Sequence, residues 1–352
     1  MKGYQFEDTQ GTFHLKKAEN ISYLYFPIAG EAGLKSSFTP NLGGDAKIDQ
    51  NTFLLEPVSA ENLVNNRNSR NFWCNVKGIG SWSLTGHSAE ELSKKFTEMQ
   101  DDSEVTAGFM WQKTTRESKK YQLRGEILSF IPVDKNVEIM LVTITNTGRM
   151  AQTVTPTAAI PLYGRSADNI RDHRHVTSLL HRIETTDTGV LVTPTLSFDE
   201  RGHQVNHMTY YCVGWSGNGE KPVDFYPTAE DFVGEGGNFE RPYAIVKNAE
   251  GVKAGTKIEG LEAVGGLHFS EITLEPEEEC SYLIFTGITE DIQEIRNLSK
   301  TYTTREKVLE ELEKTKAYWQ EKVNVAYHTG DSDFNQFMHW VSFQPILRRI
   351  YG

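Results

Sequence analysis

The chain has 352 residues, of which 38% are hydrophobic and 24% charged, and its formal net charge at pH 7 is −12. This composition is typical of a globular protein with enough length for one large domain or two ordinary ones. The acidic balance, with a sequence pI near 5.4, argues against nucleic acid or an anionic membrane as the main partner.

The N-terminal sequence and the cysteines predict where the protein resides. The first ten residues, MKGYQFEDTQ, lack the apolar core of a signal peptide, and the longest apolar runs are too short to span a bilayer. The three cysteines are isolated and form no C-x-x-C pattern, which is typical of buried thiols and not of disulfides or zinc ligands. We therefore expect a cytoplasmic protein.

Residues 1–288 are predicted to form one large β-sandwich domain. Runs rich in β-branched and aromatic residues recur along this part, separated by turn clusters such as NLGGD and SGNGEKP. The predicted strands are residues 21–28, 137–146, 153–164, 189–198, 208–216 and 280–288. Because no helical pattern lies between them, we expect a mainly β fold built as a large antiparallel sandwich.

The densest polar segment of the chain directly follows one of these predicted strands. Its candidate site residues are Arg165, Asp168, Asn169, Arg171, Asp172, His173, Arg174 and His175. On a strand, His173 and His175 would face the same side and could share a metal ion with a carboxylate. Two histidines and a carboxylate could also perform acid–base chemistry on a sugar ring.

A third interpretation of the same segment is structural. A long loop at a domain or subunit interface would also carry arginines and aspartates that pair with one another. No second cluster with the spacing of metal ligands lies nearby, so we expect no bound metal. The glycine-rich residues 231–242 precede no convincing helix and lack a Lys–Ser/Thr pair, which argues for a turn and against a phosphate-binding loop.

The pattern becomes helical after the last predicted strand. Residues 289–330 are charged, with a capping box predicted at Thr303 and Glu306, and we expect two short linker helices there. Residues 331–352 should form a further helix that begins at Asp331 or Ser332 and kinks at Pro345. Its predicted apolar stripe consists of Phe334, Phe337, Met338, Val341, Leu347 and Ile350. Such a stripe must be buried, either on the sandwich or by self-association.

Several segments, in this order, resemble the N-terminal part of the disaccharide phosphorylases of glycoside hydrolase family 94. One is the segment HVTSLLHRIETTDTGVLVT, which His175 leads, and another is the glycine-bearing turn with Gly234 and Pro242. The final WVSFQPILRRIYG resembles the first helix of the family's barrel through Trp340, Gln344, Arg349, Tyr351 and Gly352. Residues 34–63 resemble the branch that acts on β-1,2-linked glucose oligomers.

The resemblance implies a fold and an activity. Residues 1–288 would be the family's large sandwich, related to mutarotase-type sugar-binding folds, residues 289–330 its linker, and residues 331–352 the start of an (α/α)6 barrel. Family members invert: inorganic phosphate attacks the anomeric carbon of a β-glucoside while a barrel Asp protonates the departing oxygen, which gives α-glucose 1-phosphate. No catalytic residue is then expected in this chain, and no cofactor besides phosphate as co-substrate.

The same resemblance implies a homodimer in which residues 164–175 border the active site, with Arg174 and His175 as the first candidates. Two other functions remain open at this stage. One is a stand-alone carbohydrate-binding or scaffold module without chemistry. The other is a mutarotase-like epimerase that uses His173 or His175 together with a carboxylate such as Glu235.

Overall fold

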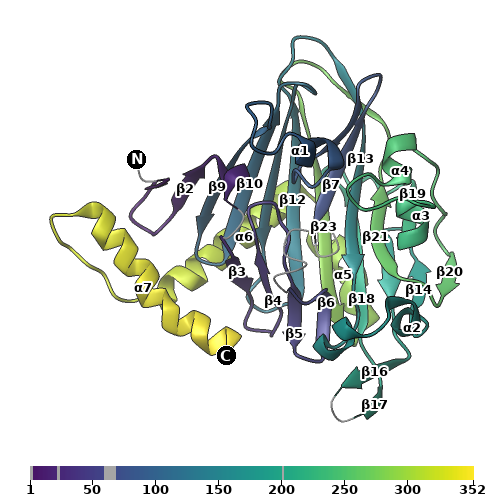
Figure 1. The fold of residues 1–352 in the computed structure, drawn as a ribbon. Coiled ribbons are helices and arrows are strands. Elements are labelled where there is room, and N and C mark those ends of the chain that lie inside the picture. The colour runs from purple at the N-terminus through teal and green to yellow at the C-terminus, as the bar shows by residue number, and fades with distance from the viewer. Residues whose placement is uncertain (1–2, 22–23, 59–68, 200–201) are drawn as a thin grey trace.

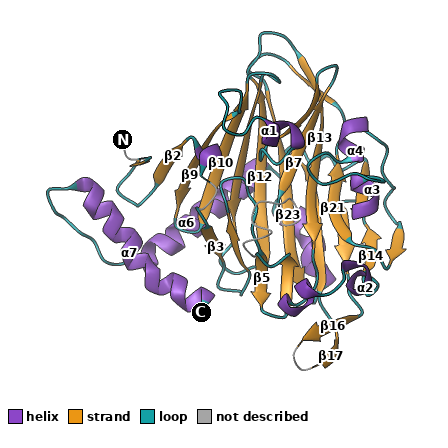
Figure 2. Cartoon of the chain, viewed as in Figure 1, coloured by secondary structure: helices purple, strands orange, loops and turns teal. Residues whose placement is uncertain are grey.

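The computed structural model describes residues 3–21, 24–58, 69–199 and 202–352, and it confirms the predicted mainly β fold. Among these residues every strand pair is antiparallel, and the helices are few and lie outside the sheets (Figures 1 and 2). None of the helices in the described ranges is both long and apolar enough to cross a membrane.

The largest sheet of the described chain has eleven strands. In spatial order they are β1 (Tyr4–Phe6), β2 (Phe13–Lys16), β9 (Asp102–Gly108), β10 (Trp111–Ser118), β11 (Leu123–Phe130), β12 (Val137–Asn146), β23 (Glu279–Thr289), β18 (Thr209–Ser216), β15 (Gly189–Val192), β14 (Arg182–Thr185) and β20 (Lys257–Glu259).

Smaller sheets pack on the large one. The six-stranded sheet contains β19 (Asp224–Thr228), β21 (Ala263–His268), β13 (Gln152–Leu162), β7 (Asn71–Val76) and β8 (Gly80–Ser83) in that order, with β22 (Ile272–Leu274) paired to β13. A four-stranded sheet contains β3 (Phe26–Ala29), β4 (Lys35–Phe38), β5 (Ala46–Asp49) and β6 (Thr52–Leu55). A hairpin pairs β16 (Leu196–Asp199) with β17 (Gly202–Val205).

The helices complete the described elements. The α-helices are α1 (Ala89–Ser93), α2 (Arg174–Ser178), α3 (Ala229–Val233), α4 (Tyr243–Lys247), α5 (Ile292–Thr301), α6 (Arg305–Lys322) and α7 (Ser332–Tyr351). Two short 3-10 helices are η1 (Ala18–Asn20) and η3 (Ala167–Arg171).

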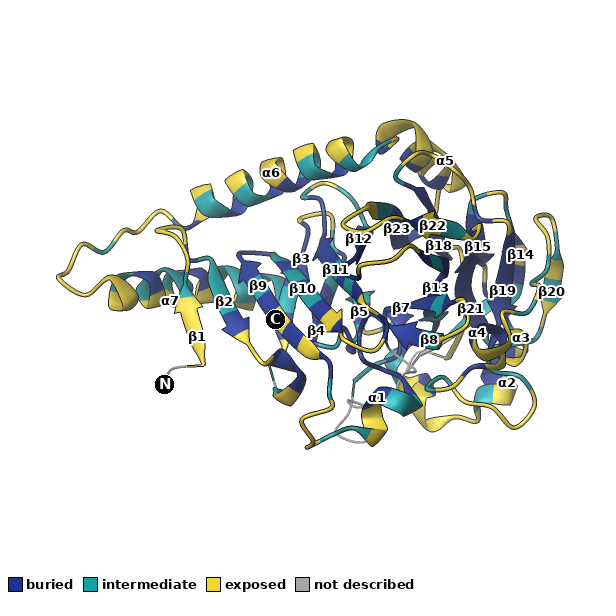
Figure 3. Cartoon of the chain, turned by 90° about the horizontal axis from the view of Figure 1, so that it is seen from above, coloured by how far each residue is buried: buried dark blue, intermediate teal, exposed yellow. Residues whose placement is uncertain are grey.

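Strand β12 shows how the core is organised on both faces of the large sheet. Alternate residues point to opposite faces of a strand, yet every residue of β12 is buried. Met140, Val142 and Ile144 belong to the main core between the sheets. Ile139 and Leu141 belong to a second cluster on the other face, which α5 and α6 cover (Figure 3). The continuous burial of this strand is therefore explained by two cores, one on each face of the sheet.

Most predicted strands agree with the structure. Residues 137–146 form β12, while β13, β18 and β23 differ from their predictions by one or two residues at an end. The predicted strand 189–198 is instead divided into β15 and β16, with Pro194 between them, because proline cannot donate a ladder hydrogen bond. Of residues 21–28, positions 22 and 23 lie outside the described residues, and β3 begins only at Phe26.

The two helices after β23 differ in detail from the prediction. Helix α6 has 18 residues and is not short, and its N-cap is Thr304, one residue after the predicted Thr303. Pro345 lies within α7 and does not end it, while Asp331 caps this helix as predicted by accepting a hydrogen bond of 3.0 Å from the Phe334 amide.

Helix α7 packs against the sandwich, but through a different stripe from the predicted one. Phe343 is fully buried against Trp319 and Phe109, and Trp340 packs on Phe109 as well. In the predicted stripe, Leu347 and Ile350 join this cluster. The prediction that the stripe packs on the sandwich was wrong for Phe334, Phe337 and Val341, which are 46%, 54% and 41% exposed. Their burial by self-association stays a prediction.

Polar contacts fix the same helix in its middle and at its C-terminal end. The Trp340 Nε1 donates to the Gly11 carbonyl at 2.8 Å, and the Tyr351 hydroxyl donates to the Ser36 carbonyl at 2.6 Å. Arg349 forms two hydrogen bonds with Glu31, at 2.6 and 2.9 Å. Each partner comes from the first 40 residues, so α7 is anchored on the N-terminal part of the chain.

Candidate functional site

The segment with the predicted site residues is a loop with two short helices and contains no strand. It begins after β13, passes through η3 and ends in α2. His173 is the N-cap of α2 and His175 lies in its first turn, so the H-x-H interpretation, which required a strand, was wrong. Within the described ranges, no group of three or more His, Cys, Asp or Glu residues could hold a metal ion.

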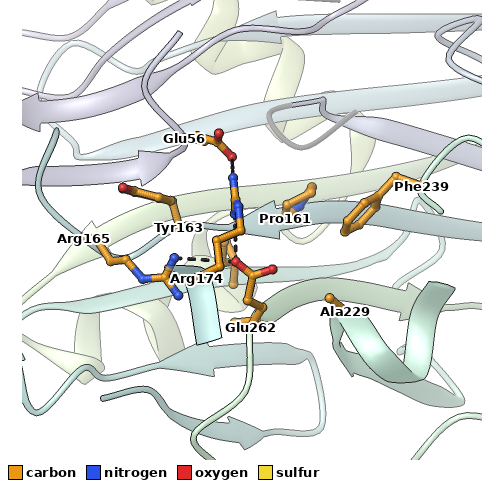
Figure 4. A pocket seen from close by; sticks show the side chains of 10 residues that line it. Glu56, Pro161, Tyr163, Arg165, Arg174, Ala229, Phe239 and Glu262 are labelled. Atoms are coloured by element: carbon orange, nitrogen blue, oxygen red, sulfur yellow. Dashed lines mark hydrogen bonds and ion pairs between the residues drawn. The ribbon is translucent and has the colours of Figure 1, made fainter. Parts of the chain in front are cut away.

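The structure brings two arginines of this loop to two carboxylates from elsewhere in the chain (Figure 4). Arg174 donates to Glu262 Oε1 at 2.8 Å and forms an ion pair with Glu56. The Arg165 Nη1 lies 3.6 Å from the same Glu262 oxygen. Figure 4 shows both guanidinium groups turned toward the Glu262 carboxylate. Together these four residues form a charged cluster, which we call the Arg–Glu cluster.

The Arg–Glu cluster is unusual because its charged side chains are largely buried. Arg165 is only 6% exposed and the Glu56 side chain 6% exposed. Burial lowers the pKa of Arg165, against the opposing effect of the Glu262 carboxylate. Burial acts on the pKa of Arg174 in the same direction, but Glu262 and Glu56 outweigh it and raise that pKa above its usual value. A guanidinium group keeps its charge in proteins, so both arginines are treated as cations.

Two adjoining hollows open at this cluster. The first is lined by the Arg–Glu cluster with Pro161, Leu162, Tyr163, Ala229, Phe239 and Ala263. The second shares Ala229, Phe239 and Glu262 with the first and is lined also by His175 and Glu235. The shared wall comes from the α3–α4 region, so residues from four separate parts of the sequence meet here.

The wall formed by the α3–α4 region depends on a glycine-bearing turn. Thr228 caps α3 by accepting a hydrogen bond of 3.1 Å from the Asp231 amide. Gly234 ends this helix with φ +74°, and a Cβ at that position would lie 2.5 Å from the Tyr243 Cβ. Only glycine fits both constraints. The predicted turn is confirmed for residues 234–242, but residues 231–233 belong to α3. The expectation that no helix follows was wrong, because α4 begins at Tyr243.

The other predicted residues do not join the cluster. Asp168, Arg171, Asp172, His173 and His175 are exposed, and Asp172 accepts a local hydrogen bond of 2.8 Å from Asn169. Sequence reasoning missed Glu56, Glu262, Tyr163 and Phe239. No local pattern marks the two glutamates, which lie 118 and 88 positions from Arg174 along the chain.

Comparison with known families identifies the family to which this architecture belongs. The model of the glycosyl hydrolase 94 supersandwich domain matches residues 55–305, which includes the entire Arg–Glu cluster. The chain belongs to glycoside hydrolase family 94. Among curated protein sequences none matches significantly.

Solved structures resemble this family 94 chain only distantly. A proposed kojibiose phosphorylase from the human microbiome is 8% identical, with a TM-score of 0.49, and the match covers 97% of this chain and 42% of that one. A bacterial glucoamylase complexed with acarbose is 9% identical, with a TM-score of 0.49 and coverage of 90% and 41%. A proposed aldose 1-epimerase from Escherichia coli K12 is 10% identical, with a TM-score of 0.40 and coverage of 75% and 98%. The chain thus spans about 42% of the length of the phosphorylase-like structure.

A buried histidine beside the Arg–Glu cluster makes the stability of the family 94 sandwich depend on pH. His181 is fully buried, and burial together with the Arg165 charge lowers its pKa from 6.5 to about 3. His181 is therefore protonated below about pH 6.5 in the unfolded chain, whereas in the folded chain it stays neutral down to about pH 3. The stability contribution of neutral His181 is complete above pH 6.5 and is lost as the pH falls through this window.

In the unaltered chain, His181 should lower the unfolding free energy by about 2 kcal/mol between pH 7 and pH 5, since the interval from pH 6.5 to pH 5 is 1.5 units. In His181→Gln this part of the decrease should be absent. Denaturant unfolding at both pH values measures it. His87→Gln should behave alike, because burial lowers the pKa of His87 to about 4. The exposed His207→Gln is the control and should match the unaltered chain. An unchanged difference in His181→Gln would contradict the expectation.

Proposed function

We propose that this chain is the N-terminal, non-catalytic portion of an inverting glycoside phosphorylase. The whole enzyme would cleave β-glucosides, with β-1,2-linked glucose oligomers preferred, and would use inorganic phosphate to release α-glucose 1-phosphate. The observation that carries this proposal is the match of residues 55–305 to the family 94 supersandwich domain. The preference for the β-1,2 linkage rests on the resemblance of residues 34–63 alone.

The exposed side of α7 supports a further domain beyond the sandwich. Phe334, Phe337 and Val341 place three large apolar side chains in water on one side of this helix. Full burial of such a side chain from water contributes roughly 1.5–3 kcal/mol, and because these three are about half exposed, covering each one would stabilise the whole protein by roughly half of that. We propose that a catalytic barrel covers them, that residues 289–330 link the two domains, and that the enzyme is a cytoplasmic homodimer.

The test compares two lengths of the protein. The 352-residue chain and a chain extended by the reading frame that follows it are incubated with phosphate and with β-1,2-, β-1,3- or β-1,4-linked glucose disaccharides. We expect glucose 1-phosphate from the extended chain only, with the β-1,2 substrate fastest. Glucose 1-phosphate release by the 352 residues alone would overturn the proposal, and so would an extended chain that hydrolyses the substrates without using phosphate.

Within the proposed enzyme, Arg174 borders the active site. Its planar guanidinium can hold two oxygens at once, and Glu56 and Glu262 fix its orientation. We expect Arg174→Lys in the extended enzyme to lower kcat/KM by about tenfold to a hundredfold, as for the loss of a charge-assisted hydrogen bond. Arg171→Lys, an exposed arginine of the same loop, should leave the kinetics unchanged. Equal kinetics for the two variants would favour the purely structural interpretation of this loop.

A mutarotase-like epimerase is the second candidate function. The observation that favours it is that His175 and Glu235 line one hollow and could act as a proton-transfer pair. His173, the other histidine predicted for this role, is not among the residues lining that hollow. Polarimetry of freshly dissolved α-glucose separates the two functions, because an epimerase needs no phosphate. The stand-alone binding module would bind sugar without either reaction.

A further inference from the structure

Arg165 is buried with fewer hydrogen bonds than its guanidinium can donate to the described residues, although that guanidinium also lies 5.2 Å from the centre of the Tyr163 ring. Its side chain is 5% exposed, and its Nε and Nη2 atoms have no hydrogen-bond partner among the residues that the structure describes. The third nitrogen, Nη1, lies 3.6 Å from Glu262, which is too long for a hydrogen bond. Leaving charged donors without partners in a protein interior is costly. A ligand that accepts hydrogen bonds from this guanidinium would remove that cost.

The surroundings of Arg165 restrict the chemistry of such a ligand. Donor and acceptor groups alternate across the hollow, from Glu56 to Arg174, then Glu262 and Arg165. An anion at Arg165 would lie close to the Glu262 carboxylate, and a cation there would lie close to two guanidinium groups. A hydroxyl group suits the site better, since its oxygen can accept from Arg165 while its hydrogen is donated to a carboxylate.

The apolar wall suits the rest of a sugar ring. Phe239 lines both hollows and stands across from the Arg–Glu cluster in Figure 4. An aromatic ring can cover the C–H face of a pyranose while polar groups bind its hydroxyl edge. The hollow at Arg165 and Arg174 has a volume of about 20 Å³, which is room for one hydroxyl group, whereas the adjoining hollow that shares Glu262 and Phe239 has about 520 Å³. We propose that a neutral saccharide lies in the larger hollow and places one hydroxyl group in the smaller one, with Arg165 as the principal donor. This refines the proposed function by giving a ligand class to the loop that borders the active site.

Binding by the 352-residue chain tests the inference without any need for turnover. Saturation-transfer NMR with D-glucose and with a β-1,2-linked glucose disaccharide should show contact with the unaltered chain. Arg165→Met keeps the length of the side chain and removes its donors. It should weaken binding by about tenfold to a hundredfold. Arg124→Met is the matched control, because the Arg124 Nε also has no partner among the described residues but lies on β11, away from the hollow.

A second measurement separates ligand binding from a structural role. Arg165→Met should melt at the same temperature as the unaltered chain or higher, because the variant buries no unpaired charge. A sugar should raise the melting temperature of the unaltered chain only, since a ligand stabilises the state that binds it. A marked fall in the melting temperature of Arg165→Met would show that protein contacts already satisfy this arginine, and would overturn the inference.

Other results also decide the matter. No contact with either sugar, equal binding by Arg165→Met, or binding of inorganic phosphate in place of sugar would each overturn the proposal. If Arg165→Met does not fold, Phe239→Ala removes the apolar wall and no charge, and retained sugar binding by that variant would have the same meaning. Phosphorolysis by the extended chain is measured separately, so a failure of the saccharide site leaves the proposed function standing.

Discussion

Phe343→Ala is expected to destabilise the attachment of α7 by about 3–5 kcal/mol, the usual result of removing a buried phenylalanine. Phe343 is fully buried in the cluster that joins α7 to α6 and to the first strands. Its ring lies 4.6 Å from that of Phe109 and 6.2 Å from that of Trp319. Because α7 depends on this cluster, the helix should detach before the sandwich unfolds.

Limited proteolysis would detect this local opening as cleavage near residues 324–331, before the sandwich is cleaved. Hydrogen exchange would detect it as loss of amide protection in α7. Phe337→Ala is the matched control, because Phe337 lies in the same helix but is 54% exposed. It should cost little in the 352-residue chain. Similar cleavage of both variants would contradict the packing of α7 described above.

The second large effect is expected at a buried ion pair in the centre of the sandwich. Arg70 and Glu138 are both fully buried, and two hydrogen bonds of 2.5 and 3.1 Å join them. Arg70 also donates to the carbonyls of Gly44 and Asp45, and the Ser36 hydroxyl donates to Glu138 at 2.6 Å. The pair thus connects the four-stranded sheet to β12 of the large sheet.

Glu138→Leu should lower the unfolding free energy by about 3–5 kcal/mol, because it leaves the Arg70 charge buried without its carboxylate. The double variant Arg70→Met with Glu138→Leu should regain much of this loss, since two apolar side chains need no partner. Denaturant unfolding measures both.

The exposed pair Lys77 and Glu271, 3.3 Å apart, supplies the control. Glu271→Leu should change the unfolding free energy by no more than about 1 kcal/mol. If Glu138→Leu cost as little, the Arg70–Glu138 pair would not hold the sheets together.

Local patterns in the sequence determined most of the fold. The predicted strand 137–146 is β12 residue for residue, and the turn at residues 234–242 needs Gly234 for reasons that its glycines already suggested. Strand periodicity and turn residues act over a few positions, so they can be recognised in a single sequence. The family resemblance, confirmed for residues 55–305, also rests on the order of such local segments.

Which face of an element is buried was decided by tertiary packing. In α7, Phe334, Phe337 and Val341 have the helical spacing of a buried stripe, yet the helix buries Gln336 and Phe343 instead, with Trp340 partly buried beside them. Two apolar stripes compete on this helix, and the aromatic surface offered by Phe13, Phe26 and Phe109 selects the one that contains Trp340. The sequence of α7 alone cannot contain that information.

In the candidate site, too, some residues could be identified from the sequence and others only from the tertiary structure. Arg165 and Arg174 were identified from the sequence because charges crowd that loop, whereas Glu56 and Glu262 carry no local signal. Only the packing of the sheets brings these carboxylates to Arg174 from 118 and 88 positions away. The sequence by itself determined β12, β13, β18 and β23 to within two residues, the turn at residues 234–242 and the family. The tertiary structure decided which charges meet and which remain unpaired, because burial and distance depend on contacts between residues far apart in the chain.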